Sequence, residues 1–569
     1  MSDRFASRRS VVHSKKGIVS CTQPLAAAAG LKVLEKGGNA AMASVAVAAA
    51  LCSLEPMMVS IGGDAFAIFY ENATKKLHGI NGSGRTPKAA SIDLLKKSGV
   101  KGPRIPQDSI HSVTVPGAAA AWVDVYEKWG NGKVSLEEAL EPVAQLAEEG
   151  HPISHVSAQL WANDAEKLLK TSKNGVDLLN SEKKAPKEGE LFANKPYAHV
   201  LRKIAKEGKD GFYKGEVAEN IVKIVDDMGG VMTLEDLAEH KSMFVDTVSM
   251  EFAGVKLQEL PPNGQGLVAL QALGILKQLD KEGKIDISKF EHNSADYLHA
   301  LIETLKYSFK DAEEFVTDIE KLDYDVNDLL SDSYLAERAK LFDPKKSNTD
   351  FDHGSINPMH KTDTVYFSVT DAEGNACSFI NSVYGGFGSA IVPDNCGFVL
   401  QNRGCNFNLT EGTRNVYAPS KRPYHTIIPA MITNPDDSLY ASFGVMGGFM
   451  QPQGHIQVLS NLRLFGLDPQ QALDSPRICL YADTDYKDEG LGPDSPISTQ
   501  NRCVVGIEEG IPDDVVKELE NRGHKVKVLK GLHKRSLFGR GQIICRNNET
   551  GVFSAGSDLR GDGAAVPQI

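Results

Sequence analysis

A threonine at the start of a predicted strand is by itself usually a structural residue, but Thr364 also follows a stretch that could be cut. Thr364 begins the alternating segment TVYFSVTD, directly after the polar stretch 342–363, which contains two prolines and has neither a helical nor a strand period. Such a stretch is typical of a linker or functional loop, and it would suit a chain that is cut there. A threonine hydroxyl is a poor nucleophile unless a base takes its proton. If the Asp363–Thr364 bond were broken, the new α-amine, with a reference pKa of about 7.7–8.0, could be that base.

Other familiar chemistries find no support in the residue spacings. The zinc motif HExxH is absent, and no group of cysteines and histidines has metal-ligand spacing. The segment GGFGSA at 385–390 lacks the GxGxxG spacing of a dinucleotide site. The eight cysteines include no CxxC pair, which excludes a disulfide scaffold and favours buried or incidental thiols.

Composition places the chain among ordinary globular proteins. It has 569 residues, 62 Lys+Arg against 74 Asp+Glu, a net charge of −12 and a mean hydropathy of −0.25. These values exclude disorder, collagen and a multi-span membrane protein, and the length allows about three to five domains. The acidic excess argues against a general nucleic-acid or anionic-membrane surface, although it does not describe a local pocket.

Two features of the first 60 residues bear on localisation. The basic N-terminus has no apolar core after it, so the sequence predicts no secretory signal. The uncharged run 37–54 approaches the length of a membrane span but consists mostly of small residues, so we expect a buried helix instead. Both observations predict a cytoplasmic protein.

The predicted elements change in kind at the polar stretch. Before it we expect mainly helices, including Pro24 to Lys36, a second helix capped by Asn39, and a long one from Ser294 to Glu314. After it we expect mainly strands, at 364–371, 376–384, 397–402, 425–434 and 438–447. The strand-rich part needs a partner for its apolar faces.

A resemblance to a known family covers nearly the whole chain. The block TVYFSVTDAEGNA at 364–376 resembles the start of the small subunit of gamma-glutamyltransferases, which are N-terminal-nucleophile hydrolases. The family pattern has a threonine four residues before Ser-Val, which selects Thr364 over Thr362. Further similar segments occur in the family's order: GGNAAMASVAVA, EPMMVSIGGDAF, GSGRTP, VPGAAAAW, PPNGQG, KRPYHTIIPAM, MGGFMQPQGH and GSDLRGDGAA.

The resemblance implies a fold and a set of catalytic residues. The implied fold is α+β, a four-layer α/β/β/α sandwich. It is one interleaved domain built from a large-subunit segment 1–363 and a small-subunit segment 364–569. The two segments stay associated after autocatalytic cleavage between Asp363 and Thr364. Thr364 is then the nucleophile, Gly447 and Gly448 supply oxyanion-hole N–H groups, and Ser382 tunes the Thr364 hydroxyl or amine. No metal or organic cofactor, nucleic acid or membrane is implied, and a homodimer stays open.

The substrate-binding positions depart from the family members that act on glutathione. Those enzymes hold the γ-glutamyl α-carboxylate with an arginine and two serines, and its amine with an aspartate, helped by an asparagine and a glutamine. Arg85 matches the arginine, and its guanidinium suits a carboxylate. The other positions carry different residues in this chain. His425 and Thr426 replace the two serines, Asn406 replaces the aspartate, Arg403 replaces the glutamine and Tyr384 replaces the asparagine.

The lost aspartate and gained arginine predict a pocket that disfavours an ammonium group and favours an anionic or neutral acyl group. This pattern is more similar to the branch that contains oxamate amidohydrolase and acylase-like relatives. Three interpretations stay open: a gamma-glutamyltransferase of glutathione metabolism, acting as hydrolase or acyltransferase on a small-molecule amide; an amidohydrolase for oxamate-like or dicarboxylic monoamides; and an unprocessed homologue without activity.

Overall fold

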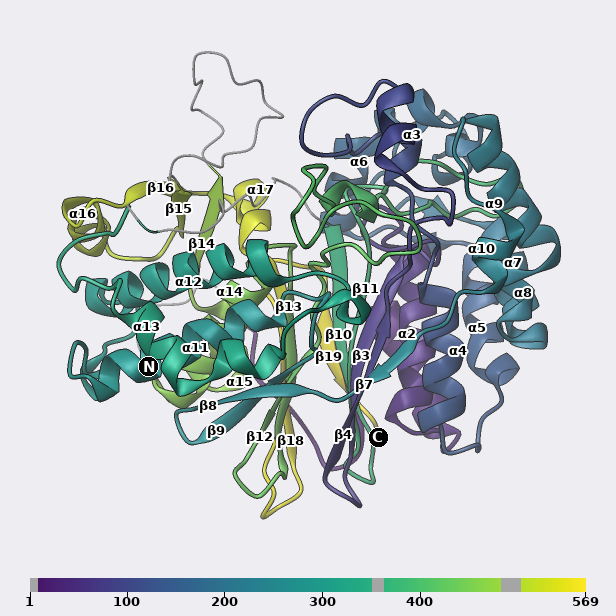
Figure 1. The fold of residues 1–569 in the computed structure, drawn as a ribbon. Helices are drawn as coiled ribbons and strands as arrows, with labels where there is room; N and C mark the ends of the chain where they lie inside the picture. Colours follow the sequence, from purple (N-terminus) through teal and green to yellow (C-terminus); the bar gives the residue numbers. More distant parts are fainter. Residues whose placement is uncertain (1–8, 350, 352–362, 483–502) are drawn as a thin grey trace.

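Two antiparallel sheets lie at the centre of the computed structural model, which describes residues 9–349, 351, 363–482 and 503–569 (Figure 1). Each has seven strands in this described part. The β10 sheet runs in the order β19 (Ala564–Pro567), β2 (Ile18–Cys21), β10 (Asp363–Thr370), β11 (Ala376–Tyr384), β3 (Asp64–Glu71), β4 (Lys76–Gly82) and β7 (Met243–Val245). The β13 sheet runs in the order β1 (Val12–Ser14), β18 (Phe553–Ser557), β17 (Arg540–Arg546), β13 (Leu439–Met446), β12 (Ala430–Thr433), β9 (Val255–Glu259) and β8 (Val248–Phe252).

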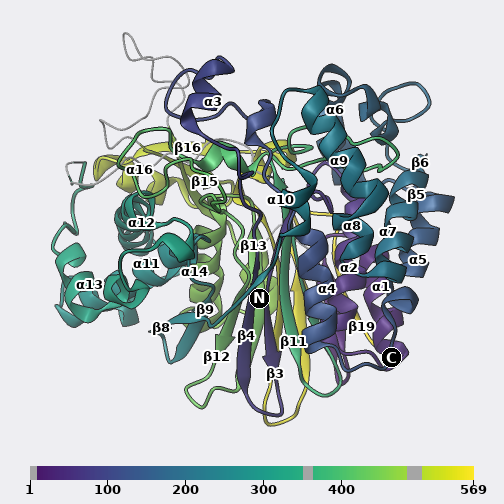
Figure 2. The same cartoon turned by 45° about the vertical axis from the view of Figure 1, so that its right-hand side comes forward.

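Helices cover the outer face of each sheet, as Figure 2 shows from a second side. The helices next to the β10 sheet are α1 (Pro24–Glu35), α2 (Ala40–Leu54), α4 (Ala118–Trp129) and, behind them, α5 (Leu136–Glu149) and α7 (Lys195–Glu207). Those on the side of the β13 sheet are α11 (Gly266–Lys281), α12 (Ala295–Phe315), α13 (Asp332–Ala339), α14 (Met450–Arg463) and α15 (Pro469–Asp474). The expectation of a mixed helix and sheet fold is therefore confirmed.

The remaining elements lie around this centre. Three strands form a small sheet, β14 (Ile478–Ala482), β15 (Cys503–Glu508) and β16 (Lys525–Leu529), and two short strands pair, β5 (His151–Pro152) and β6 (Leu191–Phe192). The further helices are α3 (Ile92–Lys97), α6 (His155–Thr171), α8 (Asp210–Tyr213), α9 (Gly215–Asp227), α10 (Leu234–Ala238), α16 (Asp513–Asn521) and α17 (Leu532–Arg535).

Polar contacts fix how the two sheets face each other. Ser368 Oγ of β10 donates to Ser442 Oγ of β13 at 2.6 Å. Two residues along, the Tyr366 ring covers Gly444, where an added Cβ would lie 2.6 Å from a ring carbon. The pairing advances in opposite directions on the two strands, toward Thr364 at the start of β10 and Met446 at the end of β13.

Several local predictions are confirmed. Asn39 caps α2 by accepting a hydrogen bond from the Met42 N–H at 3.2 Å, and all fifteen residues of α2 are buried, as expected for the run of small residues. The long helix predicted from Ser294 is α12, with Ser294 as its N-cap. None of the helices in the described ranges is long and apolar enough to cross a lipid bilayer.

Two strand predictions need correction. Segment 397–402 forms no strand but only an isolated bridge between Gly62 and Leu400, because its backbone bonds to loops instead: the Leu400 N–H donates to the Ile391 carbonyl at 2.9 Å. The strand predicted at 425–434 is shortened to Ala430–Thr433. His425 exchanges backbone hydrogen bonds with the turn 263–265 before the strand can begin.

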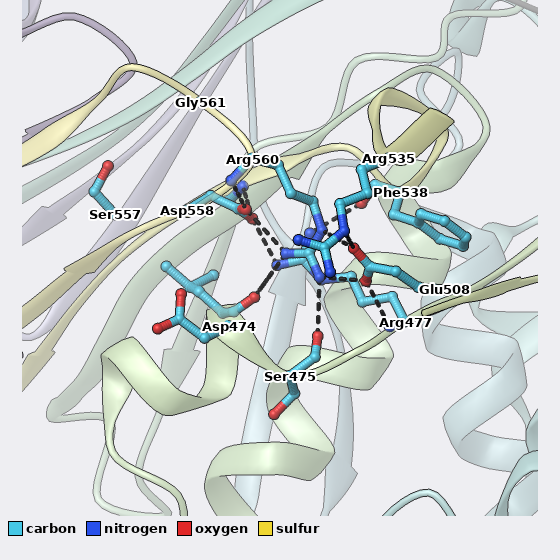
Figure 3. A network of polar contacts seen from close by, with 12 residues as sticks. Asp474, Ser475, Arg477, Glu508, Arg535, Phe538, Ser557, Asp558, Arg560 and Gly561 are labelled. Carbon is cyan, nitrogen blue, oxygen red and sulfur yellow. Dashed lines mark hydrogen bonds and ion pairs between the residues drawn. The ribbon is translucent and has the colours of Figure 1, made fainter. Parts of the chain in front are cut away.

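A buried ion cluster anchors the C-terminal loop of the chain (Figure 3). Arg477 Nη2 lies 2.7 Å from Asp558 Oδ2, and Arg560 Nη1 lies 2.9 Å from Asp558 Oδ1. Arg560 Nε donates to Glu508 Oε1 at 2.8 Å, which ties the same loop to β15. All four side chains are buried, so the cluster joins the 558–563 loop to the small sheet.

The same cluster supports the turn between β13 and α14. Arg477 Nη1 donates to the Phe538 carbonyl at 2.9 Å, and the Gly541 N–H donates to Asp558 Oδ2 at 2.8 Å. Between them Gly539 packs on Gly447, whose added Cβ would lie 3.1 Å from the Gly539 Cα. The ion cluster thus fixes the backbone against which the Gly447 turn rests.

Asp558→Asn should destabilise the protein in a pH-dependent way. Loss of one partner from a buried ion cluster costs about 3–5 kcal/mol, because Arg477 and Arg560 keep an unbalanced charge. Burial alone would raise the pKa of Asp558, but the two guanidinium groups outweigh it and lower the pKa to about 2. The contribution of Asp558 to the free energy of unfolding is therefore complete above the ordinary aspartate pKa. It disappears as the pH falls toward the pKa that Asp558 has in the folded protein.

The check is a comparison of thermal unfolding midpoints from neutral to acidic pH. We expect the unfolding midpoint of Asp558→Asn to lie clearly below that of wild type at neutral pH, and this difference to become smaller below about pH 4. Glu549→Gln, at an exposed acid in a turn, should leave the midpoint unchanged. A difference in midpoint that stays constant at every pH would contradict the lowered pKa of Asp558.

Candidate active site

Thr364 lies buried at the first inner position of β10. The β10–β11 register shifts between Asp363 and Val365, so Thr364 occupies a bulge, a feature that redirects a side chain. Its Oγ1 donates to Ser382 Oγ of β11 at 3.0 Å. The predicted cut site falls at the edge of what is described: residues 350 and 352–362 and the Asp363 side chain lie outside the described residues.

Ser382 joins the candidate nucleophile to the rest of the site. Besides Thr364, its Oγ accepts the Tyr384 N–H at 2.9 Å and Arg403 Nη2 at 3.1 Å. Three donors thus converge on one buried hydroxyl oxygen, which holds its position firmly. Tyr384 has φ of 81°, a conformation that a non-glycine residue adopts only when its surroundings enforce it.

Arg403 is a fully buried cation with incomplete hydrogen bonding. Nη1 donates to Thr426 Oγ1 at 2.6 Å, the guanidinium lies 4.4 Å from the centre of the Tyr384 ring, and Nε has no partner among the described residues. No carboxylate in the described ranges is in ion-pair contact with it. Burial lowers the pKa of Arg403 to about 10, and the charge of Asp64 opposes the shift only in part.

Asp64 and His425 form a buried pair beside this cation. Asp64 is the cross-strand neighbour of Ser382, and its Oδ2 lies 2.9 Å from His425 Nε2. Its Oδ1 accepts hydrogen bonds from Gly84 N, Gly117 N and Gln401 Nε2. His425 Nδ1 accepts the Ile427 N–H at 3.3 Å, so Nε2 carries the proton and donates to Asp64.

The environment keeps His425 uncharged. Burial and the positive charge of Arg403 lower the pKa of His425 to about 4, although Asp64 opposes the shift. The pair is therefore a carboxylate held by a neutral imidazole, and Asp64 is fully occupied by donors other than Arg403. Sequence analysis missed Asp64, although it stands in the matched segment EPMMVSIGGDAF.

Gly447 and Gly448 form the turn between β13 and α14, with φ of 131° and 57°. Neither N–H donates a hydrogen bond to any described residue, whereas both carbonyls are used: Gly447 O accepts Met450 N at 3.0 Å, and Gly448 O accepts Gln265 Nε2 at 2.8 Å. Two unused N–H groups before a helix N-terminus suit a developing negative charge. Gln265, also missed from the sequence, donates to Thr426 O as well and so links this turn to the Arg403 partner.

The other two predicted substrate residues are placed differently. Asn406 is buried, and its amide donates to the Tyr424 carbonyl at 3.2 Å. Arg85 is a quarter exposed and forms an ion pair with Glu320. The structure therefore brings together Thr364, Ser382, Tyr384, Arg403, His425 and Thr426, while the partly exposed Arg85 guanidinium is engaged with the Glu320 side chain.

One group of side chains in the described ranges has metal-ligand composition. The ligand atoms of His299, Glu303 and His524 lie within 4.8 Å of one another. However, Lys306 Nζ lies 2.7 Å from Glu303 Oε1, and His299 Nδ1 already bonds to His524 Nε2 at 2.8 Å. An ammonium group on the carboxylate opposes a divalent cation there, so we interpret the group as a structural anchor within the fold.

Comparison with known proteins gives consistent results. The family model described as gamma-glutamyltranspeptidase matches residues 26–568. A glutathione hydrolase-like YwrD proenzyme of Bacillus subtilis is 34% identical, with 98% of this chain and 99% of that protein covered. An oxamate amidohydrolase proenzyme of Klebsiella pneumoniae is 29% identical over 97% of this chain and 98% of that protein. The crystal structure of a cephalosporin acylase from Bacillus halodurans superposes with a TM-score of 0.86 at 38% identity, covering 100% of this chain and 98% of that one.

The imidazole of His425 should stay neutral, protonated on Nε2, at all pH values above about 5. Nuclear magnetic resonance of isotope-labelled histidine, with His425→Asn to assign the signal, measures both properties. Because the unfolded chain binds the proton near pH 6.5, this shift should also make folding less favourable as the pH falls from about 6.5 toward 4. A His425 titration midpoint near its ordinary value would show that the pair is not as described.

Proposed function

This chain belongs to the gamma-glutamyltranspeptidase family, and from that premise we propose that it hydrolyses amide bonds, or transfers their acyl group, with Thr364 as the nucleophile. The names of its relatives, glutathione hydrolase, oxamate amidohydrolase and cephalosporin acylase, support an amide-cleaving enzyme. The burial of Thr364 Oγ1 and its bond to Ser382 support the choice of residue. We also propose that the two sheets and their outer helices are the four-layer α/β/β/α sandwich of N-terminal-nucleophile hydrolases.

The proposed reaction begins with a cut between Asp363 and Thr364, which fits the proenzyme names of several relatives. The new Thr364 amine takes the proton from Oγ1, and the oxygen attacks the acyl carbon of the substrate. We assign stabilisation of the oxyanion to the unused N–H groups of Gly447 and Gly448, because the contacts between β10 and β13 run toward Thr364 on one strand and toward this turn on the other. The amine then returns the proton to the leaving nitrogen as the C–N bond breaks and an ester on Thr364 remains.

The ester on Thr364 is resolved in one of two ways. Attack by water regenerates the hydroxyl and releases the carboxylic acid, whereas attack by an amine forms a new amide. Ser382 positions Oγ1 throughout, because Arg403 and the Tyr384 N–H hold the serine oxygen in place.

Arg403 supports an anionic acyl group as the substrate. A buried guanidinium without a contacting carboxylate is costly, and a substrate carboxylate within reach of it would remove that cost. The same charge repels the ammonium of an amino-acid head, and Asn406 supplies no countercharge. We therefore propose dicarboxylic monoamides, with oxamate-like compounds included, over γ-glutamyl compounds.

Cleavage is tested on a denaturing gel with N-terminal sequencing. We expect two fragments, the smaller beginning at Thr364, and one uncut chain for Thr364→Ala. Thr370→Ala is a matched control, because Thr370 is a buried threonine on the same strand, and it should be cut normally. A stable uncut wild-type chain would favour the homologue without activity, and cutting of Thr364→Ala would mean that another residue is the nucleophile.

Substrate preference is tested with three p-nitroanilides of matched length. The glutaryl compound has a terminal carboxylate, the L-γ-glutamyl compound adds an α-ammonium, and the pentanoyl compound has neither. We expect the highest kcat/KM for glutaryl, and a glutaryl-to-pentanoyl ratio that falls about 10- to 100-fold in Arg403→Gln, as expected for hydrogen bonds to a charged group.

The test of substrate preference has a control variant and one result that would contradict the proposal. Arg463→Gln also removes a guanidinium that lies over a tyrosine ring, 4.9 Å from the centre of Tyr440, and should not change the ratio. Efficient hydrolysis of the L-γ-glutamyl compound alone, with oxamate and glutaryl amides inert, would overturn the proposed substrate class.

A further inference from the structure

We propose that Glu320 is a specificity-determining residue: it occupies Arg85 and thereby directs the carboxylate of the acyl group to Arg403. This inference rests on the proposed function, because it names which of two arginines near the site receives the substrate. Glu320 belongs to the short turn of helix Ile319–Lys321 that follows α12, and Arg85 to the loop after β4.

The Arg85–Glu320 contact is an ion pair within a balanced group of charges. Glu320 Oε2 bonds to Arg85 Nη2 and also lies 3.2 Å from Arg422 Nη1. Arg422 is buried and lies 3.6 Å from Asp318, so two arginines face two carboxylates. Burial would raise the pKa of Glu320, but Arg85 and Arg422 lower it overall, and Glu320 stays ionised.

This group borders the candidate active site. Gly84, the residue before Arg85, donates its N–H to Asp64 Oδ1 at 2.9 Å, and Asp64 is the cross-strand neighbour of Ser382. The exposed fractions of the Arg85 and Glu320 side chains are 25% and 47%, so a dissolved substrate can reach the pair. Arg85 follows directly on this backbone contact, and Glu320 already neutralises its charge.

A substrate anion should therefore bind more favourably at Arg403 than at Arg85. Arg403 is fully buried, so a substrate anion must first gain access to it, and there it meets a guanidinium with no carboxylate in contact among the described residues. At Arg85 the anion must displace Glu320 and remain beside it, and two adjacent carboxylates repel each other. Glu320 cannot serve the ammonium of an amino acid either, since both arginines engage it. The charge of Arg403, unpaired within the described part of the chain, and the mutual neutralisation of Arg85 and Glu320 together favour an acyl group with one terminal carboxylate and no amine.

The experiment compares wild type, Glu320→Gln, the double variant Glu320→Gln/Arg85→Gln and a control, with the three p-nitroanilides. Glu314→Gln is the control, because Glu314 has a similar exposed fraction, 43%, and pairs with another arginine, Arg414. We expect Glu320→Gln to raise the L-γ-glutamyl-to-pentanoyl ratio of kcat/KM about tenfold, a typical effect of one charged hydrogen bond. The double variant should lose this gain, and Glu314→Gln should match wild type.

A binding measurement separates failure of this inference from failure of the proposed function. Calorimetric titration with L-glutamate and glutarate, without any reaction, should show tighter L-glutamate binding in Glu320→Gln alone. If none of the amides is cleaved but this shift occurs, the proposed function fails and the role of Glu320 stands. Equal changes for all three donors, an unchanged ratio, or unchanged L-glutamate affinity would overturn the inference.

Discussion

Burial of the Arg403 guanidinium organises the site around it. A buried cation is costly unless other groups compensate for the lost water. Here the compensation comes from the hydroxyls of Ser382 and Thr426 and the face of the Tyr384 ring, none of which carries a charge. The charge of Asp64 acts on Arg403, but this carboxylate is hydrogen-bonded to His425 and to donors from three other segments and forms no ion pair with the guanidinium. The protein thus maintains a positive centre one hydroxyl away from Thr364.

The rest of the fold holds that centre against the Gly447 turn. Contacts between β10 and β13 join Ser368 to Ser442 and the Tyr366 ring to Gly444, and Gln265 links the Gly448 carbonyl to Thr426. The ion cluster of Asp558 and Arg477 fixes the neighbouring backbone on which Gly447 rests. Because strands of both sheets come from before and after residue 364, neither chain segment can form this site alone.

Local signals made much of the fold predictable from the sequence. Capping residues and apolar spacing located α2 and α12, and short motifs identified the family and the residues that meet around Ser382. Features that depend on contacts between distant segments could not be predicted. Segment 397–402 looks like a strand but bonds to loops, and the Arg85 guanidinium is neutralised by Glu320, 235 positions away in the chain. Asp64 and Gln265 stood in recognised motifs, but only the folded chain shows what they bind.

The most direct test of the account is the intact mass of the fragment that begins at Thr364, trapped by acid during turnover of the glutaryl p-nitroanilide and followed by peptide mapping. The account predicts one glutaryl group per fragment, bound as an ester on Thr364, and a much smaller acylated fraction in Arg403→Gln. An acyl group on another residue, or turnover by an uncut chain, would contradict it.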